Sequence, residues 1–154
     1  MEIRTIIFRG KRIDNGEWIY GYFVSEGEES YIFEQEEVDK GIDLGGYLDC
    51  CKMREVVPST VGQCTGLTDK DGRKMFEGDI IDVSQDPHFA YVGVALYRYG
   101  LFKVVFHKAC FMKRKITEKN DEKGLYHFLE TEQYQVVGNI FDNSELLKGG
   151  EQND

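Results

Sequence analysis

The segment 65–83, TGLTDKDGRKMFEGDIIDV, constrains the fold of this chain more than any other part of the sequence. Asp71-Gly72 lies between two runs that contain apolar residues, and this dipeptide suits a tight reversal because glycine accepts a positive φ. Gly78 marks a second turn. The run 79–83 that follows is short, rich in β-branched residues and bounded by polar ones, so it predicts a strand with a buried face. The segment therefore predicts a hairpin followed by a further strand.

The same pattern of β-branched and aromatic runs between turn residues recurs along the chain. Further strands are predicted at 3–8, 17–24, 31–33, 53–57, 61–67, 89–99, 101–107 and 134–141. The first two runs are expected to form a hairpin around Asp14-Asn15-Gly16, and another hairpin is expected to turn at Tyr99-Gly100. Because no helix recurs between the strands, an all-β fold, a small barrel or sandwich, is favoured over a parallel α/β sheet.

Helical signals are few. The run 143–147 predicts a capped helical turn, whereas 116–124 is compatible with either a short helix or a disordered loop. With 154 residues and 41% hydrophobic content, the chain is expected to form a single domain over 1–147. Residues 25–49 are predicted to be an acidic, glycine-rich insertion, 113–124 a polar loop and 148–154 a flexible tail.

The charge of the chain bears on its partners. A net charge of −9 opposes a broad attraction to nucleic acid or anionic lipid. The stretch 26–39 contains acidic residues without lysine or arginine, which is typical of a solvated face or of a docking surface for a basic partner. No apolar run approaches the length of a membrane helix, and residues 1–4 lack the order of a signal peptide. A cytoplasmic location in the cell that makes the protein is therefore expected.

Known catalytic and metal-binding patterns fit the sequence poorly. The glycine spacing of 66–72 departs from that of a phosphate-binding loop, and Asp69 to Gly72 departs from a calcium-binding loop. The four cysteines form no C-x-x-C pair. Two weaker possibilities are a metal-binding group of Asp82, Asp86 and His88, and a thiol at Cys110 beside His107. The sequence thus predicts no catalytic residue, metal or cofactor.

Tyrosines at alternating strand positions form the main candidate for an interaction surface. Tyr20 and Tyr22 share one strand face by their spacing, as do Tyr97 and Tyr99. Such stripes usually pack in a core or a subunit interface, but they can also stack on nucleic acid bases where cations lie nearby. A basic cluster that could serve this purpose is Lys113, Arg114 and Lys115.

Two sequence blocks carry a family resemblance. Residues 65–79 follow the pattern TGLxDKxGxxxFEGD, and 136–147 follow VxGNIFDNxELL. With FRGK at 8–11 and WIYG at 18–21, these blocks resemble the YopX family of phage and prophage proteins over nearly the whole chain. The resemblance implies a small, mainly β protein that can self-associate and is encoded by a bacterial virus or an integrated one. It brings no catalytic residues.

The sequence therefore predicts a non-enzymatic phage accessory protein that binds a phage or host protein or forms a homo-oligomer, without a membrane. The alternative is a nucleic-acid-binding module that uses the tyrosine stripes and the basic edge at 113–115. A third alternative is a small hydrolase or metal enzyme around Asp82, Asp86 and His88.

Overall fold

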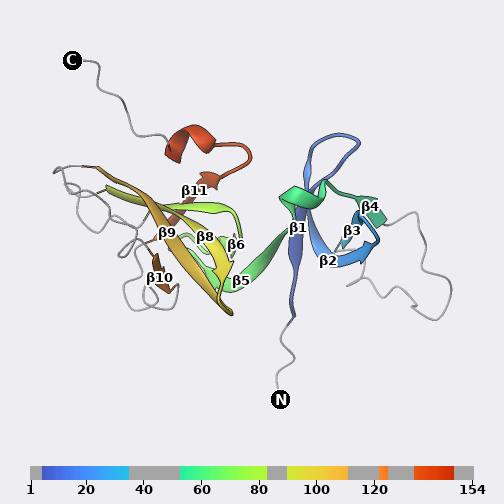
Figure 1. Cartoon of the computed structure of the whole chain (residues 1–154), viewed down its shortest axis with the longest axis horizontal. Coiled ribbons are helices and arrows are strands. Elements are labelled where there is room, and N and C mark those ends of the chain that lie inside the picture. Colours follow the sequence, from blue (N-terminus) through green and yellow to red (C-terminus); the bar gives the residue numbers. More distant parts are fainter. Residues whose placement is uncertain (1–4, 35–52, 83–89, 111–121, 125–133, 148–154) are drawn as a thin grey trace. The chain divides into compact units, whose positions relative to one another are not determined.

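A computed structural model describes residues 5–34, 53–82, 90–110, 122–124 and 134–147 (Figure 1). Its backbone contacts group the chain into two compact units, Met1–Cys64 and Thr65–Asp154. Each unit has a hydrophobic cluster of its own. The single domain predicted for 1–147 stays a prediction, which the unfolding of the two units can test.

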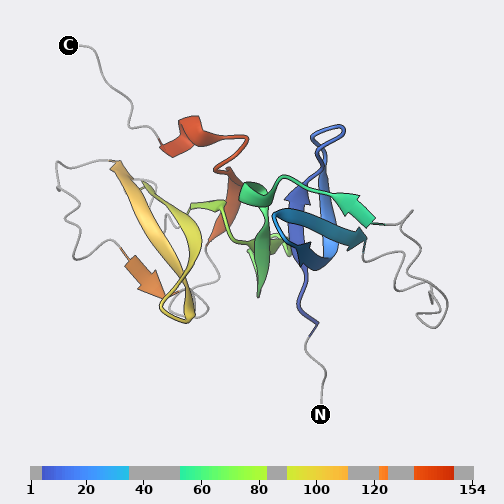
Figure 2. The ribbon, with the colours of Figure 1, turned by 45° about the vertical axis from the view of Figure 1, so that its right-hand side comes forward.

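The first unit is an antiparallel sheet in the hydrogen-bonded order β4-β3-β2-β1-β5 (Figure 2). Its elements are β1 (Phe8–Lys11), β2 (Trp18–Glu26), β3 (Glu29–Glu34), β4 (Met53–Glu55), the 3₁₀-helix η2 (Pro58–Thr60) and the first part of β5 (Gly62–Thr68). Ile19, Ile32 and Val56 form its core. The ring of Phe8 packs against this core and lies 5.3 Å from the ring of Phe23. The first part of β2 alternates as expected for a sheet with one covered face, since Ile19 and Gly21 are buried and Tyr20 between them is exposed.

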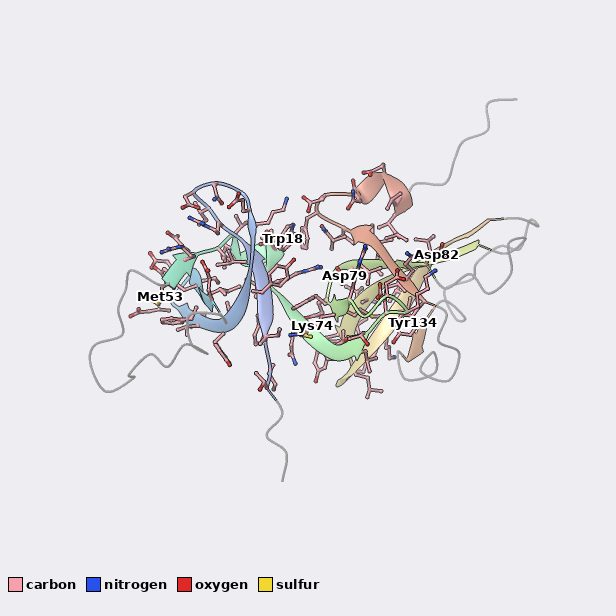
Figure 3. The ribbon with its side chains drawn as sticks, turned by 180° about the vertical axis from the view of Figure 1, so that it is seen from behind. Trp18, Met53, Lys74, Asp79, Asp82 and Tyr134 are labelled. Atoms are coloured by element: carbon pink, nitrogen blue, oxygen red, sulfur yellow. The ribbon has the colours of Figure 1, made fainter. Side chains whose placement is uncertain are left out.

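The second unit holds a five-stranded antiparallel sheet in the order β10-β9-β8-β7-β11. Its elements are the end of β5, β6 (Lys74–Phe76), β7 (Asp79–Asp82), β8 (Ala90–Arg98), β9 (Leu101–Cys110), β10 (Glu122–Gly124), β11 (Gln135–Asn139) and the 3₁₀-helix η4 (Ser144–Leu147). The core consists of Met75, Ile81, Ala95, Val104 and Tyr134, the last of which is labelled in Figure 3. Strand β5 crosses from one unit into the other and pairs with β6 in the second.

The all-β prediction is confirmed, with short 3₁₀-helices as its only helical elements among the described residues. Of the two architectures expected, a closed barrel is absent from the described strands, since each sheet has a linear strand order with two ends. The hairpin turns predicted at Asp71-Gly72 and Tyr99-Gly100 are both present.

The first predicted strand is wrong in its bounds. We expected it at 3–8, but it runs over Phe8–Lys11, and residues 5–7 have no regular structure. The reason is the register of the hairpin. The turn at 13–16 places Lys11 opposite Trp18, so the pairing extends from there back to Phe8, opposite Gly21. In the run 116–124, residues Glu122–Gly124 form β10 against β9, which neither expected alternative included.

Several expected features lie outside the described residues. These are most of the acidic insertion (35–49), the start of the polar loop (113–121), the tail (148–154), Asp86 and His88. No helix within the described ranges is long and apolar enough to cross a membrane.

Candidate functional site

The first family-like block is held together by Asp69, which follows the end of β5 and precedes the Asp71-Gly72 turn. Its Oδ1 accepts hydrogen bonds from the backbone N–H groups of Asp71 and Arg73, both at 2.9 Å, and its Oδ2 accepts one from Val136 at 3.1 Å. Burial alone would raise the pKa of this carboxyl, but the three N–H donors outweigh it and lower the pKa below its usual value. Asp69 therefore links the turn to β11, and both of its carboxylate oxygens accept backbone hydrogen bonds.

The acids that flank Gly78 are engaged in the same way. Asp79 is buried, and its Oδ2 accepts a hydrogen bond of 2.8 Å from the backbone N–H of Phe76 (Figure 3). Glu77 accepts one of 3.1 Å from the backbone N–H of Tyr97. Asp79 thus binds the backbone of its own turn, and Glu77 binds the backbone of β8. These contacts favour a structural role for both acids over that of a catalytic carboxylate pair.

The second family-like block is also built around backbone hydrogen bonds. Asn139 Oδ1 accepts from the N–H groups of Phe141 at 3.0 Å and Asp142 at 2.9 Å, which closes the turn after β11. Asn143 Oδ1 in turn accepts from the N–H of Asn139 at 3.2 Å. A side chain on Gly138 would place its Cβ 2.5 Å from that oxygen, so only glycine leaves room for the Asn143 amide.

The predicted helical turn at 143–147 is present as η4, but its cap differs from the expectation. The Asn143 side chain bonds Asn139, and the helix begins instead with a backbone hydrogen bond of 3.0 Å from the Leu146 N–H to the Asn143 carbonyl. The residues that carry the resemblance to a known family therefore specify turns. Their contacts explain local structure, and the candidate functional surface is made by other residues.

The candidate tyrosines divide between the two units. Tyr20 and Tyr22 lie in β2 of the first unit, while Tyr97 lies near the end of β8 in the second unit and Tyr99 lies in the turn after β8. They are therefore described as two separate surfaces. The basic residues Lys113, Arg114 and Lys115, expected to accompany them, lie outside the described residues.

In the first unit, Tyr20 lies on the sheet face opposite the core residue Ile19. The register places Arg9 across from Tyr20, and Lys11 across from Trp18, on that same face. The Arg9 guanidinium carbon lies 4.8 Å from the centre of the Trp18 ring, and the Lys11 ammonium lies 5.4 Å from it. We call Arg9, Lys11, Trp18 and Tyr20 the β1–β2 aromatic face. Sequence reasoning missed its Trp18, although the alternation along β2 could have placed this residue beside Tyr20.

In the second unit, β8 and β9 are joined by a two-residue turn in which both residues have positive φ, 54° for Tyr99 and 79° for Gly100. A turn of this kind matches the twist of the strands, and asparagine or glycine usually occupies its first position. Tyrosine there costs roughly 1–3 kcal/mol in backbone strain. The chain therefore holds a large aromatic side chain at a position where folding alone would favour a small polar residue.

This turn displays a group of exposed side chains that we call the β8–β9 tip, residues 97–103. Tyr99 is 87% exposed, Tyr97 53% and Leu101 50%, and Arg98 is exposed between the tyrosines. The Tyr97 ring meets Phe102 edge-on at 5.1 Å, and the Lys103 ammonium lies 4.9 Å from the Tyr99 ring. These contacts orient the rings, so the tip presents apolar area that is already ordered. Leu101 was not anticipated from the sequence.

Backbone groups of β8 next to this tip already form hydrogen bonds within the chain. Two residues that precede β7 bind this part of β8: the Gly78 N–H donates to the Ala95 carbonyl at 2.8 Å, and the Glu77 carboxylate accepts from the Tyr97 N–H. Occupied edge groups hinder the addition of another strand at this position. The tip can therefore recognise a partner through its side chains rather than by extending the sheet.

Groups of three or more histidine, cysteine or carboxylate side chains that could hold a metal ion do not occur among the described residues. Asp82, one of the three residues considered for such a site, lies at the end of β7. The side chains of His107 and Cys110 in β9 lie outside the part of the chain whose side chains are described.

Comparisons with known proteins place these features in context. A family model described as YopX protein matches residues 7–148. A solved structure, the crystal structure of protein EF1440 from Enterococcus faecalis, is similar to this chain at 20% sequence identity and a TM-score of 0.48. That match covers 94% of this chain and 99% of the other. No curated protein matches the chain.

Proposed function

The chain belongs to the YopX family, and we propose that it is a non-enzymatic accessory protein of a phage or prophage that acts by binding a protein partner or by assembling with copies of itself. The surface that does so is the β8–β9 tip. One observation carries the proposal: Tyr99 occupies a strained turn position and is 87% exposed. Exposed aromatic residues with cations beside them are typical of the residues that dominate binding energy in protein interfaces.

The chemistry of the motif blocks supports a binding function over catalysis. A catalytic acid or base needs a lone pair or proton available to a substrate. Asp69 accepts three backbone hydrogen bonds, and Asp79 is buried under the turn that it stabilises. A binding protein requires none of these groups to react. On this account the protein works in the cytoplasm of a bacterial host cell, without cofactor or metal.

Light scattering coupled to size exclusion tests the assembly arm of this proposal. The wild-type protein is measured over a range of concentrations, with Tyr99→Asn and, as a matched control, Tyr20→Thr, which removes an exposed tyrosine from a strand of the first unit. We expect a discrete oligomer for the wild type and the control, and a lower mass for Tyr99→Asn. An oligomer that Tyr99→Asn leaves intact would exclude the tip as its interface.

A wild-type monomer at every concentration would exclude self-assembly and leave the partner arm. That arm is tested with a photo-crosslinking amino acid at position 99, introduced in cells that carry the phage genes. A single covalent adduct of defined mass is expected, and it should be missing when the crosslinker is placed at position 20. Equal labelling at both positions would contradict a tip-directed partner.

The β1–β2 aromatic face supports a second candidate function, nucleic acid binding. The exposed Tyr20 near Trp18, with the Lys11 ammonium beside the Trp18 ring, resembles the combination of aromatic rings and cations that binds single-stranded bases, while Arg9 beside Trp18 is buried. This function predicts that a fluorescent single-stranded oligonucleotide binds more weakly as salt rises, and that Trp18→Leu and Arg114→Glu each reduce affinity. The net charge of −9 opposes it, and binding that is absent at low salt would exclude it.

A further inference from the structure

We propose that the β8–β9 tip docks on the acidic end of the β2–β3 hairpin in a second copy of this chain. The inference rests on the assembly arm of the proposed function and names the surface that receives the tip. We call residues 24–31 the β2–β3 tip. Glu26, Glu28 and Glu29 are exposed there, next to Val24, which is an exposed large hydrophobic residue.

The charges of the two tips are complementary. Residues 97–103, YRYGLFK, contain Arg98 and Lys103 and no acid, and the Glu77 carboxylate that accepts from the Tyr97 N–H lowers the local charge from +2 to +1. Residues 24–31, VSEGEESY, contain three glutamates and no base, which gives −3. Two copies of a chain with a net charge of −9 repel one another overall. A contact between the cationic tip of one copy and the acidic tip of the other replaces this repulsion locally by attraction.

The two tips also match in their apolar surface. The β8–β9 tip presents Tyr97 on one face of its hairpin, Leu101 on the other face and Tyr99 at the turn between them. The β2–β3 tip presents Val24. Tyr31, which faces Val24 across the hairpin, donates a hydrogen bond from its hydroxyl to Glu29. This bond holds one of the three carboxylates in place. An interface with an apolar centre and charged groups around it is the usual arrangement between proteins.

Each copy carries both tips, one on each compact unit. A tip-to-tip contact joins different surfaces of two copies, so it can be satisfied reciprocally in a two-fold dimer or head to tail in a ring. In both cases every copy uses one tip of each kind. The number of contacts therefore equals the number of copies, and loss of either tip abolishes all contacts at once.

Reciprocal charge reversal tests this pairing in the full chain. One variant carries Arg98→Glu and Lys103→Glu, the other carries Glu26→Lys and Glu28→Lys, and a third carries all four changes. We expect each double variant to raise the dissociation constant of the oligomer at least about tenfold, and the fourfold variant to recover it, because opposite charges then face one another again. Glu145→Lys, an exposed reversal in η4, is the control and should leave the mass unchanged.

The outcomes separate this inference from the proposed function. An oligomer that both double variants leave intact overturns the tip-to-tip contact, while assembly through another surface stands. Weakening by one double variant without recovery in the fourfold variant also overturns the pairing, since the acidic tip is then not the receiver. A wild-type monomer at all concentrations overturns the inference together with self-assembly. Circular dichroism of every variant verifies that a loss of mass is not a loss of fold.

Discussion

Replacing Asp69 by asparagine tests whether one carboxylate fastens the second unit together. The side chain is 5% exposed and accepts backbone hydrogen bonds from Asp71, Arg73 and Val136. Asparagine can keep its carbonyl oxygen toward the first two donors, but its NH₂ group then faces the N–H of Val136. One buried N–H is left unsatisfied, which costs about 1–3 kcal/mol, and the other two bonds lose the assistance of the negative charge. Together these losses amount to about 2–4 kcal/mol.

Urea unfolding measures this loss. We expect the midpoint of Asp69→Asn, followed by circular dichroism, to fall by about 1–2 M for a slope of roughly 2 kcal/mol per M. The matched control is Asp71→Asn, since Asp71 is exposed and its carboxylate accepts an exposed side-chain hydrogen bond from Gln135. The control should change stability by less than about 0.5 kcal/mol. Equal effects of the two substitutions would refute the structural role of Asp69.

The same experiment reports on the domain organisation. Trp18, the single tryptophan of the chain, lies in the first unit, whereas Asp69 lies in the second. If residues 1–147 unfold as one domain, tryptophan fluorescence and circular dichroism will show the same lowered midpoint in Asp69→Asn. A fluorescence midpoint that stays at its wild-type value would show that the units unfold separately.

Three further predictions follow from particular contacts. The pKa of Asp69 is lowered in the folded state, so its carboxylate contributes fully to stability above the unfolded pKa of about 3.9, and this contribution is lost as the pH falls through the folded pKa. The difference in the free energy of unfolding between wild type and Asp69→Asn should therefore shrink below about pH 4. A difference that stays constant with pH would contradict this. Gly138→Ala should lower the free energy of unfolding by about 1–3 kcal/mol because its Cβ would lie within 3.0 Å of Oδ1, Cγ and Cβ of Asn143. Asn143→Gly, which removes all three atoms, should make the further cost of Gly138→Ala much smaller, and an equal cost in both backgrounds would contradict this. The hydrogen bond to Glu29 raises the pKa of Tyr31 to about 12, so Glu29→Gln should move one tyrosine titration in the ultraviolet spectrum to lower pH, and an unchanged titration would refute that contact.

The sequence was sufficient where local chemistry decides the structure. Asp71-Gly72 and Tyr99-Gly100 were located correctly because a tight turn depends on a few adjacent residues and their φ angles. The start of the first strand was not, because pairing in a hairpin is set by its partner strand rather than by the apolar run at 3–8. The sequence likewise predicted a capped helical turn at 143–147, whereas the Asn143 side-chain oxygen accepts a hydrogen bond from the backbone N–H of Asn139.

Features that depend on long-range contacts or on solvent exposure were not predicted from the sequence. The Asp69 carboxylate reaches Val136, a residue 67 positions away, and no local pattern indicates that bond. The four candidate tyrosines were treated together in the sequence, whereas the structure assigns them to two units. Spacing alone also could not reveal that Tyr99 is strained and exposed, since both properties depend on the turn that the two strands complete.

The most direct test of the account is to measure assembly and stability together in Tyr99→Asn. Asparagine tolerates the positive φ of this position better than tyrosine, so we expect the free energy of unfolding to rise by up to about 1 kcal/mol. If the tip serves binding, the oligomer mass or the crosslinked partner will be lost in this more stable protein. A variant that assembles and binds like the wild type, or that is destabilised by the change, would show that Tyr99 serves the fold and would contradict the account.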